Sequence, residues 1–418
     1  MQAKNVLIIG QGAREHALAQ ALAESRWVRE IWAAPGNPGL AELARLSPVT
    51  TVDGWVDLAE RVGGLTVVGP EAPLAAGLAD RLRARGLPVV GPGAEAARLE
   101  SSKIYAKRVM QEMHIATARS VAVDGLDTLA LQVRRQWRLP VVIKEDGLAQ
   151  GKGVTIVRSE ADWDAFLGQQ TARQSPARWI VEEYLDGREV SIEVLTNGRD
   201  YVWLPVAVDH KRLTADVGSP NTGGMGAYSP VPWLTEADRR RIDAEVLGPL
   251  MTYLQEHRID YRGILYVGCM MTEDGPYVLE FNVRLGDPEA SVVLPLINDD
   301  IYPWLAELTE GRLLATSLPV STQAAVAVVV ASQGYPAASL VGRAIRIGRH
   351  VARARVLHAG TQLVDGKLVS RGGRVLTVVG LGPELAAART TAYAGVDQIS
   401  LEGAVVRRDI GAEFDSVG

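Results

Sequence analysis

The chain has 418 residues, of which 47% are apolar and 22% charged, a composition typical of a globular protein with two to four domains. Its 49 acidic and 44 basic residues give a formal net charge of -5, which excludes a general electrostatic attraction to nucleic acid or to an anionic membrane. The single cysteine, Cys269, excludes an internal disulfide, and no Cys/His spacing indicates a zinc site. Without a cleavable apolar leader or a run of 18 apolar residues, we expect a soluble, cytoplasmic protein.

The first hundred residues predict a Rossmann-like domain. An apolar run at 5–9 ends in glycine, and residues 14–24 place their apolar side chains on one helical face. Further apolar runs at 65–69 and 87–91 are separated by helix-patterned segments around 72–86. Alternating strands and helices of this kind indicate a parallel sheet, so we expect a domain over residues 1–100.

Three strand ends of this domain carry candidate binding residues. The turn at Gly12 opens a helix whose N-terminus could hold a phosphate, but Glu15 stands where a dinucleotide fingerprint has its third glycine, and no acidic residue follows at the ribose position. A phosphate ester site and a simple tight turn remain equally open. Asn37 could bond a sugar hydroxyl, and Glu71 could face a ligand or only favour a helix start.

A second α/β pattern follows a predicted helix at 101–113 and gives a small lobe over residues 101–188. Its strand at 140–144 delivers Lys144 to a loop with Gly147, Gly151 and Gly153 around Lys152. Glycines let backbone amides close over a polyphosphate while lysines neutralise its charge. This is not a Walker loop, because Gly153 follows the lysine where serine or threonine is required. The alternative is a mobile hairpin.

Carboxylates surround a bend that follows the next predicted strand, at 179–185. Glu182, Glu183 and Glu189 flank the bend Leu185-Asp186-Gly187. Such a bend between two lobes could offer backbone groups to an adenine and a carboxylate to a ribose. The alternative is an edge strand with solubilising charge.

Residues 189–318 predict a hairpin-rich α+β core. The pair Asn197-Gly198 lies between strand patterns at 189–195 and 200–208, a strong hairpin signal. Thr235 and Asp238 form a capping box that opens a helix to about residue 257. Strands at 263–271 and 276–283 follow, and the last unit, 319–418, has strands at 324–332 and 373–379 and a helix at 384–394.

Two further segments of the core carry candidate ligands. Glu280, Asn282 and Arg284 alternate onto one strand face, where two hard oxygens suit Mg²⁺ and a guanidinium suits a phosphoryl group or a carboxylate. The alternative is an edge-strand salt bridge. The segment 221–226 is rich in glycine and lets the backbone approach a small ligand, although an ordinary irregular loop is also compatible.

Ten short motifs occur in a fixed order along the whole chain. They are GxGxREHA, APGNxG, VGPEAPL, IKxDGLAxGKGV, EExLxGxExS, DHKR, NTGGMGAYSP, EFNxRxGDPE, HAGT and GGRVL. In this the chain resembles the phosphoribosylamine-glycine ligase family. The resemblance implies a multidomain α/β and α+β protein with the ATP-grasp fold, an N-terminal Rossmann-like domain and a C-terminal β-rich domain. It also implies ATP, Mg²⁺ or Mn²⁺, glycine and 5-phosphoribosylamine as ligands, with no nucleic acid or membrane partner, and is compatible with a monomer.

The resemblance also implies roles for individual residues. Lys107 and Lys144 would contact the ATP phosphates under the loop 147–153. Glu182, Leu185 and Glu189 would hold adenine and ribose, and Glu280 and Asn282 would bind the metal. The glycine and acyl-phosphate site would be lined by Arg284, Asp209, Asn221, Gly223, Gly224 and Gly226. Gly12, Asn37 and Glu71 would face phosphoribosylamine, and Arg284, Lys144 and Asp209 would be the catalytic residues.

The implied reaction forms glycyl phosphate from glycine and ATP, and the amine then displaces phosphate, so catalysis would depend on positioning and electrostatics. Glu145 and Gln150 depart from the alanines usual in the phosphate loop, and residues 213–220 lack the usual acidic run. As the neighbour of Lys144 on a strand, Glu145 should point to the opposite face.

Two alternative functions remain. One is another ATP-grasp carboxylate-amine ligase or carboxylase of purine synthesis, and the other is a regulatory module without catalysis.

Overall fold

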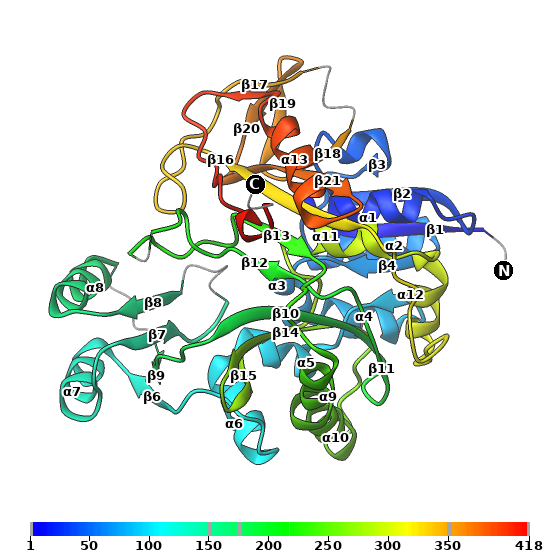
Figure 1. Cartoon of the computed structure of the whole chain (residues 1–418). Helices are drawn as coiled ribbons and strands as arrows, with labels where there is room; N and C mark the ends of the chain where they lie inside the picture. Colours follow the sequence, from blue (N-terminus) through cyan, green and yellow to red (C-terminus); the bar gives the residue numbers. More distant parts are fainter. Residues whose placement is uncertain (1–2, 149–152, 174–177, 217, 349–352, 416–418) are drawn as a thin grey trace.

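The computed structural model describes residues 3–148, 153–173, 178–216, 218–348 and 353–415, and Figure 1 shows their arrangement. A parallel five-stranded sheet in the order β3-β2-β1-β4-β5 forms the N-terminal part, as the alternating pattern predicted. Its strands are β1 (Lys4–Gly10), β2 (Val28–Pro35), β3 (Arg45–Leu46), β4 (Leu65–Val68) and β5 (Val89–Val90). Its helices are α1 (Ala13–Ala23), α2 (Val52–Val62), α3 (Glu71–Ala75) and α4 (Leu78–Ala84). The helical segments predicted around 72–86 are confirmed as α3 and α4, which are separated at Gly77, where φ is 79° in the left-handed region.

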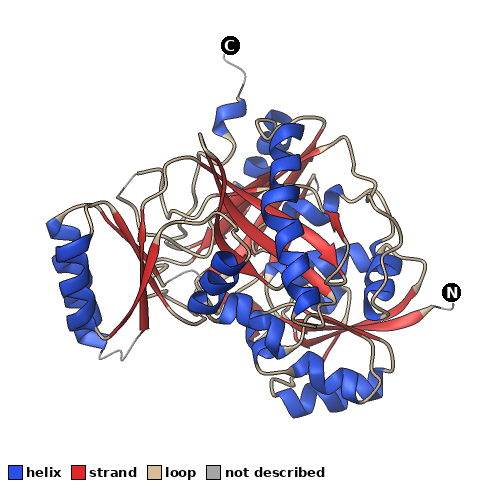
Figure 2. Cartoon of the chain, turned by 90° about the horizontal axis from the view of Figure 1, so that it is seen from below, coloured by secondary structure: helices blue, strands red, loops and turns tan. Residues whose placement is uncertain are grey.

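Two helices, α5 (Ala94–Ser101) and α6 (Lys103–Glu112), lead to a small lobe that stands apart at one side of the molecule (Figure 2). Its antiparallel sheet has the order β6-β9-β7-β8. The strands are β6 (Ser120–Asp124), β7 (Val141–Glu145), β8 (Val154–Val157) and β9 (Arg178–Glu183), and the helices are α7 (Leu126–Gln136) and α8 (Glu160–Arg173). The lobe has its own apolar core, which includes Trp163, Phe166 and Trp179. It is therefore a separate packing unit.

The central antiparallel sheet has the order β11-β10-β14-β15. Its strands are β10 (Arg188–Thr196), β11 (Tyr201–Trp203), β14 (Gly263–Thr272) and β15 (Gly275–Asn282). The hairpin predicted at Asn197-Gly198 is confirmed by the pairing of β10 with β11. The strand predicted over 200–208 ends early, at Trp203, and Pro205, which lacks a backbone N–H to donate, follows.

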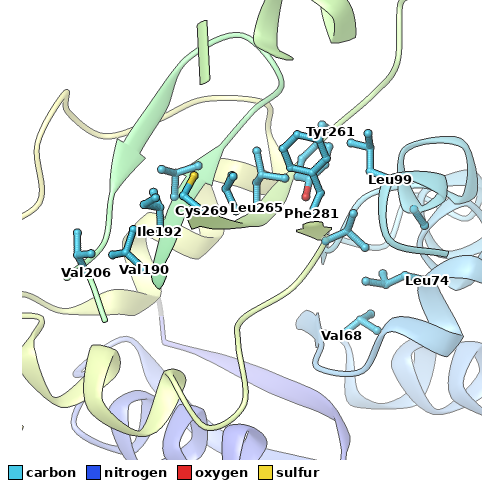
Figure 3. Close-up of a cluster of buried hydrophobic side chains, with 14 of the residues drawn as sticks. Val68, Leu74, Leu99, Val190, Ile192, Val206, Tyr261, Leu265, Cys269 and Phe281 are labelled. Carbon is cyan, nitrogen blue, oxygen red and sulfur yellow. The ribbon is translucent and has the colours of Figure 1, made fainter. Parts of the chain in front are cut away.

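The capping box of Thr235 and Asp238 is confirmed at the start of α9 (Glu236–Ile242), and a π-helical turn continues the helix into α10 (Gly248–Glu256). The central sheet shares a buried cluster with the N-terminal part: Tyr261, Leu265 and Phe281 lie near Leu74 and Leu99 (Figure 3). This continuous core fixes the N-terminal sheet relative to β15, which carries candidate site residues.

The C-terminal sheet takes two of its strands from the middle of the chain. Its order is β12-β13-β16-β21-β18. The strands are β12 (Val208–Asp209), β13 (Gly226–Ser229), β16 (Ala324–Ala331), β18 (Ala354–His358) and β21 (Arg374–Gly382), covered by α13 (Leu385–Val396). The segment between β12 and β13 is thus held at both ends by the C-terminal sheet.

Smaller elements complete the chain. They are α11 (Ala290–Val293), α12 (Ile301–Thr309) and the two-stranded pairs β17 (Ile345–Ile347) with β22 (Ile399–Leu401) and β19 (Thr361–Val364) with β20 (Lys367–Ser370). Across the described ranges, every helix is too short or too polar to cross a bilayer.

Candidate active site

A cavity of about 860 Å³ lies where the N-terminal sheet, the small lobe, the central sheet and the C-terminal loops meet. This volume is in the range of pockets that enclose small-molecule ligands. The residues predicted from sequence that line it are Gly12, Glu71, Lys107, Lys144, Gly147, Gly153, Glu182, Leu185, Glu189, Asp209, Asn221, Gly223, Glu280, Asn282 and Arg284. Residues from four separate parts of the sequence therefore surround one space.

Lysines gather at the end of the cavity formed by the small lobe. The buried carboxylate of Glu182 lies 2.8 Å from the ammonium nitrogens of both Lys107 and Lys144. Burial alone would raise the pKa of Glu182, but the two lysines outweigh it and lower this pKa. The carboxylate of Glu182 thus neutralises the lysines, which is a different task from the predicted contact with adenine or ribose. Lys103, which the sequence reasoning missed, donates to the Gly147 carbonyl at 2.7 Å.

The predicted phosphate loop connects β7 and β8, which form an antiparallel hairpin. Gly147 and Gly153 line the cavity, whereas Gly151, Lys152 and Gln150 lie outside the described residues. On β7, Val142 and Lys144 line the cavity and Glu145 does not, as the alternation of side chains along a strand requires.

The face of β15 presents the predicted metal ligands. Burial raises the pKa of Glu280, but Lys211, Lys144 and Lys103 lower it to about 2, so this carboxylate is ionised. Lys211 lies 3.5 Å from Glu280 and is also paired with Glu189.

The Asn282 amide oxygen, two residues after Glu280, lines the same cavity and accepts a 3.3 Å hydrogen bond from Arg284. In the described ranges no group of three or more His, Cys, Asp or Glu side chains is arranged to hold a metal. The carboxylate oxygen of Glu280 and the amide oxygen of Asn282 are of the kind that a hard cation takes alongside nucleotide phosphates.

Arg284 forms ion pairs with two carboxylates. Its guanidinium lies 2.8 Å from Glu100 and 3.4 Å from Glu71, and it donates to the Leu285 carbonyl at 3.0 Å. Although burial lowers the pKa of Arg284, Glu100 and Glu71 raise it, so the side chain stays charged. Glu100 was not predicted from sequence, because it lies on a helix far from Arg284 along the chain.

The glycine-rich segment contributes fewer lining residues than predicted. Asn221 and Gly223 line the cavity, but Gly224 and Gly226 do not. Gly224 has a left-handed φ of 104°, and a Cβ on it would lie 2.3 Å from Pro288. A Cβ on Gly226 would lie 2.5 Å from the Ala327 carbonyl. These two glycines therefore allow close backbone packing, and their predicted contact with substrate is corrected.

Asp209 lies beside this segment; the residue is half-buried and its Oδ1 atom is buried. Its Oδ1 has no hydrogen-bond partner within the described part of the chain. Burial, together with the nearby Glu289, raises the pKa of Asp209. A buried acceptor without a donor at the edge of a cavity is suited to a cationic or N–H ligand group.

In the turn after β1, the carboxylate of Glu15 binds the backbone. The Gly12 amide donates to Glu15 at 2.5 Å, and a Cβ on Gly69 would lie 2.1 Å from the same carboxyl group. Arg14 lies 2.6 Å from Glu15. Glu15 thus accepts the hydrogen bond of a backbone amide at the N-terminus of α1, where the sequence analysis considered a phosphate. The alternative of a simple tight turn agrees with this geometry.

The prediction for Asn37 is also corrected. Its amide nitrogen donates to the carbonyls of Gln11 and His358, both at 2.8 Å, and its oxygen accepts from the Leu40 amide at 3.0 Å. The side chain is 4% exposed and lies outside the cavity lining. Asn37 therefore connects the N-terminal and C-terminal parts of the chain instead of facing a ligand.

The C-terminal part supplies lining residues that the sequence analysis did not predict. Residues 359–361 and 371–374 line the cavity, and Arg371 lies 3.5 Å from the Gln11 amide oxygen in the turn after β1. Arg374 donates to the carbonyls of Gly223 at 2.5 Å and Asp287 at 2.7 Å, which ties the glycine-rich segment to the C-terminal sheet. The strings HAGT and GGRVL were the only sequence signal for these loops.

Comparisons with known proteins agree with this architecture. Residues 4–100, 101–290 and 325–413 match the N, ATP-grasp (A) and C domains of phosphoribosylglycinamide synthetase. The chain is 39% identical to phosphoribosylamine–glycine ligase of Caldanaerobacter subterraneus over 98% of its own length and 100% of that protein. It is 42% identical to the same-named protein of Ralstonia nicotianae, covering 97% of this chain and 98% of that protein.

A crystal structure of phosphoribosylamine–glycine ligase from Thermotoga maritima superposes with a TM-score of 0.84 and 34% identity, covering 97% of this chain and 100% of that chain. A biotin carboxylase domain from Hydrogenobacter thermophilus, with a TM-score of 0.72 and 17% identity over 97% of this chain and 92% of that chain, shares the fold alone. These matches confirm the predicted ATP-grasp fold and family resemblance, and the chain belongs to the phosphoribosylglycinamide synthetase family.

Proposed function

We propose that this protein is an ATP-dependent ligase that joins glycine to 5-phosphoribosylamine, giving glycinamide ribonucleotide, ADP and phosphate in purine synthesis. The observation that carries the proposal is the single cavity, in which lysines, the β15 carboxylate and the glycine-rich segment converge. The full-length relatives named phosphoribosylamine–glycine ligase support it.

In this proposal ATP lies between the small lobe and the central sheet. Lys107 and Lys144 bind its phosphates, and their charge is at present balanced by Glu182. The loop between β7 and β8, including Gly147, Lys152 and Gly153, closes over the phosphates, while Leu185 and Glu189 hold adenine and ribose. Closing the lobe excludes water from the reacting groups.

Mg²⁺ or Mn²⁺ is the cation that we propose for Glu280 and Asn282. Carboxylate and amide oxygens are ligands that Mg²⁺ prefers alongside nucleotide phosphates, and the low pKa of Glu280 keeps its carboxylate ionised. When bound, the cation offsets the negative charge of the phosphates. Lys211, 3.5 Å from Glu280, would have to share or leave this carboxylate when the cation binds.

Glycine binds between Arg284 and Asp209 in this proposal. Arg284 orients the glycine carboxylate, and the partnerless oxygen of Asp209 accepts a hydrogen bond from the amino group, with Asn221 and Gly223 closing the site. A carboxylate oxygen of glycine attacks the γ-phosphorus, and the bond to the ADP oxygen breaks. The phosphoribosylamine nitrogen then attacks the glycyl carbonyl carbon, phosphate leaves, and the nitrogen loses a proton. The chain supplies position and charge, and no covalent enzyme intermediate forms.

Phosphoribosylamine then lies over the ends of β1 and β4, where Gly12 and Glu71 line the cavity. Ligands bind at the carboxyl ends of parallel strands in α/β sheets, which supports this placement. We further propose a division into units 1–100, 101–188, 189–318 and 319–418, and a monomer in the cytoplasm.

The test is ADP release with Mg²⁺, ATP, glycine and freshly generated phosphoribosylamine, each omitted in turn. We expect ADP formation to require both co-substrates and glycinamide ribonucleotide to appear in equal amount. ADP release that continues without glycine would refute the assignment and indicate another ATP-grasp ligase. Lys144→Met is expected to abolish turnover, whereas Lys367→Met, on an exposed hairpin of the C-terminal part, is expected to leave it unchanged.

A further inference from the structure

The carboxylate of Glu15 at the N-terminus of α1 would repel a phosphate monoester. The Glu15 carboxylate accepts the Gly12 amide and packs against Gly10 and Gly69, where it occupies the space that an anion would need. A dianionic phosphate placed there would face this carboxylate at short range. If the sugar substrate carries a phosphate, the cavity has to bind that phosphate elsewhere.

Among the described residues, most lysine and arginine side chains that line the cavity form an ion pair with a carboxylate. Lys107 and Lys144 share Glu182, and Lys211 is paired with Glu189. The arginines are similarly engaged, in the pairs Arg14–Glu15, Arg284–Glu100 and Arg374–Asp287. Lys103 donates to a carbonyl beside the phosphate loop, at the end of the cavity that we assign to ATP.

Arg371 differs from these cations. It is exposed, lines the cavity, and has no acidic side chain within ion-pair distance among the residues that the structure describes. Among the described residues, its side chain donates one hydrogen bond, at 3.5 Å, to the amide oxygen of Gln11, which directly precedes Gly12. The guanidinium therefore lies beside the turn after β1 and has no ion pair among the described residues.

The backbone around Arg371 is suited to an anion. The Arg371 amide donates to the Gly360 carbonyl at 2.7 Å, and a Cβ on Gly360 would lie 2.9 Å from the Gly372 nitrogen, so two glycine-containing loops touch here. Both loops line the cavity. The amides of Gly372 and Gly373 have no acceptor in the described part of the chain. Successive backbone amides beside a guanidinium are a common anion-binding arrangement.

We propose that Arg371, with the backbone of Gly372 and Gly373, binds the 5-phosphate of the sugar substrate. The C-terminal loop, rather than the N-terminus of α1, is then the phosphate-recognition element. This inference rests on the proposed function for the identity of the sugar. It requires only a phosphate monoester on a small sugar that enters from the side of the turn after β1.

The experiment compares steady-state kinetics of the wild-type protein with Arg371→Gln, Arg371→Lys and a matched control, Arg346→Gln. Arg346 is an exposed arginine of β17 that does not line the cavity. A charge-assisted hydrogen bond contributes enough that we expect Arg371→Gln to raise KM for phosphoribosylamine roughly 10- to 100-fold. KM for ATP and glycine and kcat should stay within about twofold, Arg371→Lys should recover part of the loss, and Arg346→Gln should match wild type.

A binding measurement separates this inference from the proposed function. Calorimetry with ribose 5-phosphate, ribose and inorganic phosphate does not require turnover. We expect wild type to bind ribose 5-phosphate more tightly than ribose, and Arg371→Gln to lose that preference. Inorganic phosphate should compete with ribose 5-phosphate in wild type.

Different failures point to different errors. A wild-type protein without ligase activity refutes the proposed function, while the calorimetry still decides the role of Arg371. An unchanged KM for phosphoribosylamine in Arg371→Gln, or equal increases in KM for all three substrates, overturns the inference. So does a preference for ribose 5-phosphate that persists in the variant.

Discussion

Replacing Glu182 by glutamine should destabilise the small lobe, because it removes the counter-charge of two buried lysines. Each ammonium lies 2.8 Å from the carboxylate, and Glu182 is 2% exposed. At this separation and an effective dielectric constant of about 20, each pair corresponds to about 6 kcal/mol of attraction. Desolvation offsets much of that attraction, and losing one partner of a buried pair typically costs about 3–5 kcal/mol.

The lobe contains its own reporters, since Trp163 and Trp179 belong to its core. We expect a thermal transition followed by tryptophan fluorescence to shift down by roughly 10 °C or more for Glu182→Gln, because a lobe of this size loses about 4–8 °C per kcal/mol. Mg-ATP should stabilise the variant more than wild type, since the phosphates supply the missing negative charge.

Glu183→Gln is the matched control. Glu183 follows Glu182 in the same strand, is partly exposed, and lies 3.8 Å from the exposed Arg119, so its loss should change stability by less than about 1 kcal/mol. If both variants melt at the same temperature as wild type, the two lysines do not depend on Glu182, and the charge balance proposed for the ATP site is incorrect.

Three further predictions follow from individual residues. Asn37→Ala should lower the free energy of unfolding by about 1–3 kcal/mol through its lost buried hydrogen bonds, while KM for phosphoribosylamine stays unchanged; a selective rise in that KM would restore Asn37 as a substrate ligand. Burial raises the pKa of Glu193 from 4.5 to about 8 in the folded chain, so wild-type stability should fall as pH rises from about 4.5 to 8. Glu193→Gln should therefore match wild type near pH 4.5 and be more stable at pH 9 in thermal melts, and a difference independent of pH would contradict this. The buried thiol of Cys269, whose pKa burial raises to about 12, should react with a disulfide reagent only in denaturant, and rapid reaction in native buffer would show that β14 opens.

Local sequence patterns were sufficient for several parts of the site. The alternation of Glu280, Asn282 and Arg284 predicted a shared face, and all three line the cavity. The capping box at Thr235 was equally readable, because it involves residues three positions apart. Patterns of this kind depend on contacts within one element, which periodicity records directly.

Other features depend on contacts between distant segments and could not be read locally. The Arg284–Glu100 pair joins residues 184 positions apart, by subtraction of their numbers, and Asn37 bonds to the His358 carbonyl. The fold-back of Glu15 onto Gly69 depends on the space left by two parallel strands. Tertiary packing decided these positions, and only the family resemblance indicated the C-terminal loops.

The shared C-terminal sheet has a consequence for how the chain can fold as it is synthesised. β13 pairs with β12 on one side and with β16 on the other, and β16 pairs with β21, so the strand at 226–229 lacks its second neighbour until about a hundred more residues have left the ribosome. Domains generally fold from the N-terminus during synthesis, and an unpaired strand edge is prone to aggregation. We therefore expect the segment that ties the glycine-rich residues to the C-terminal sheet to be among the last parts of the cavity to form.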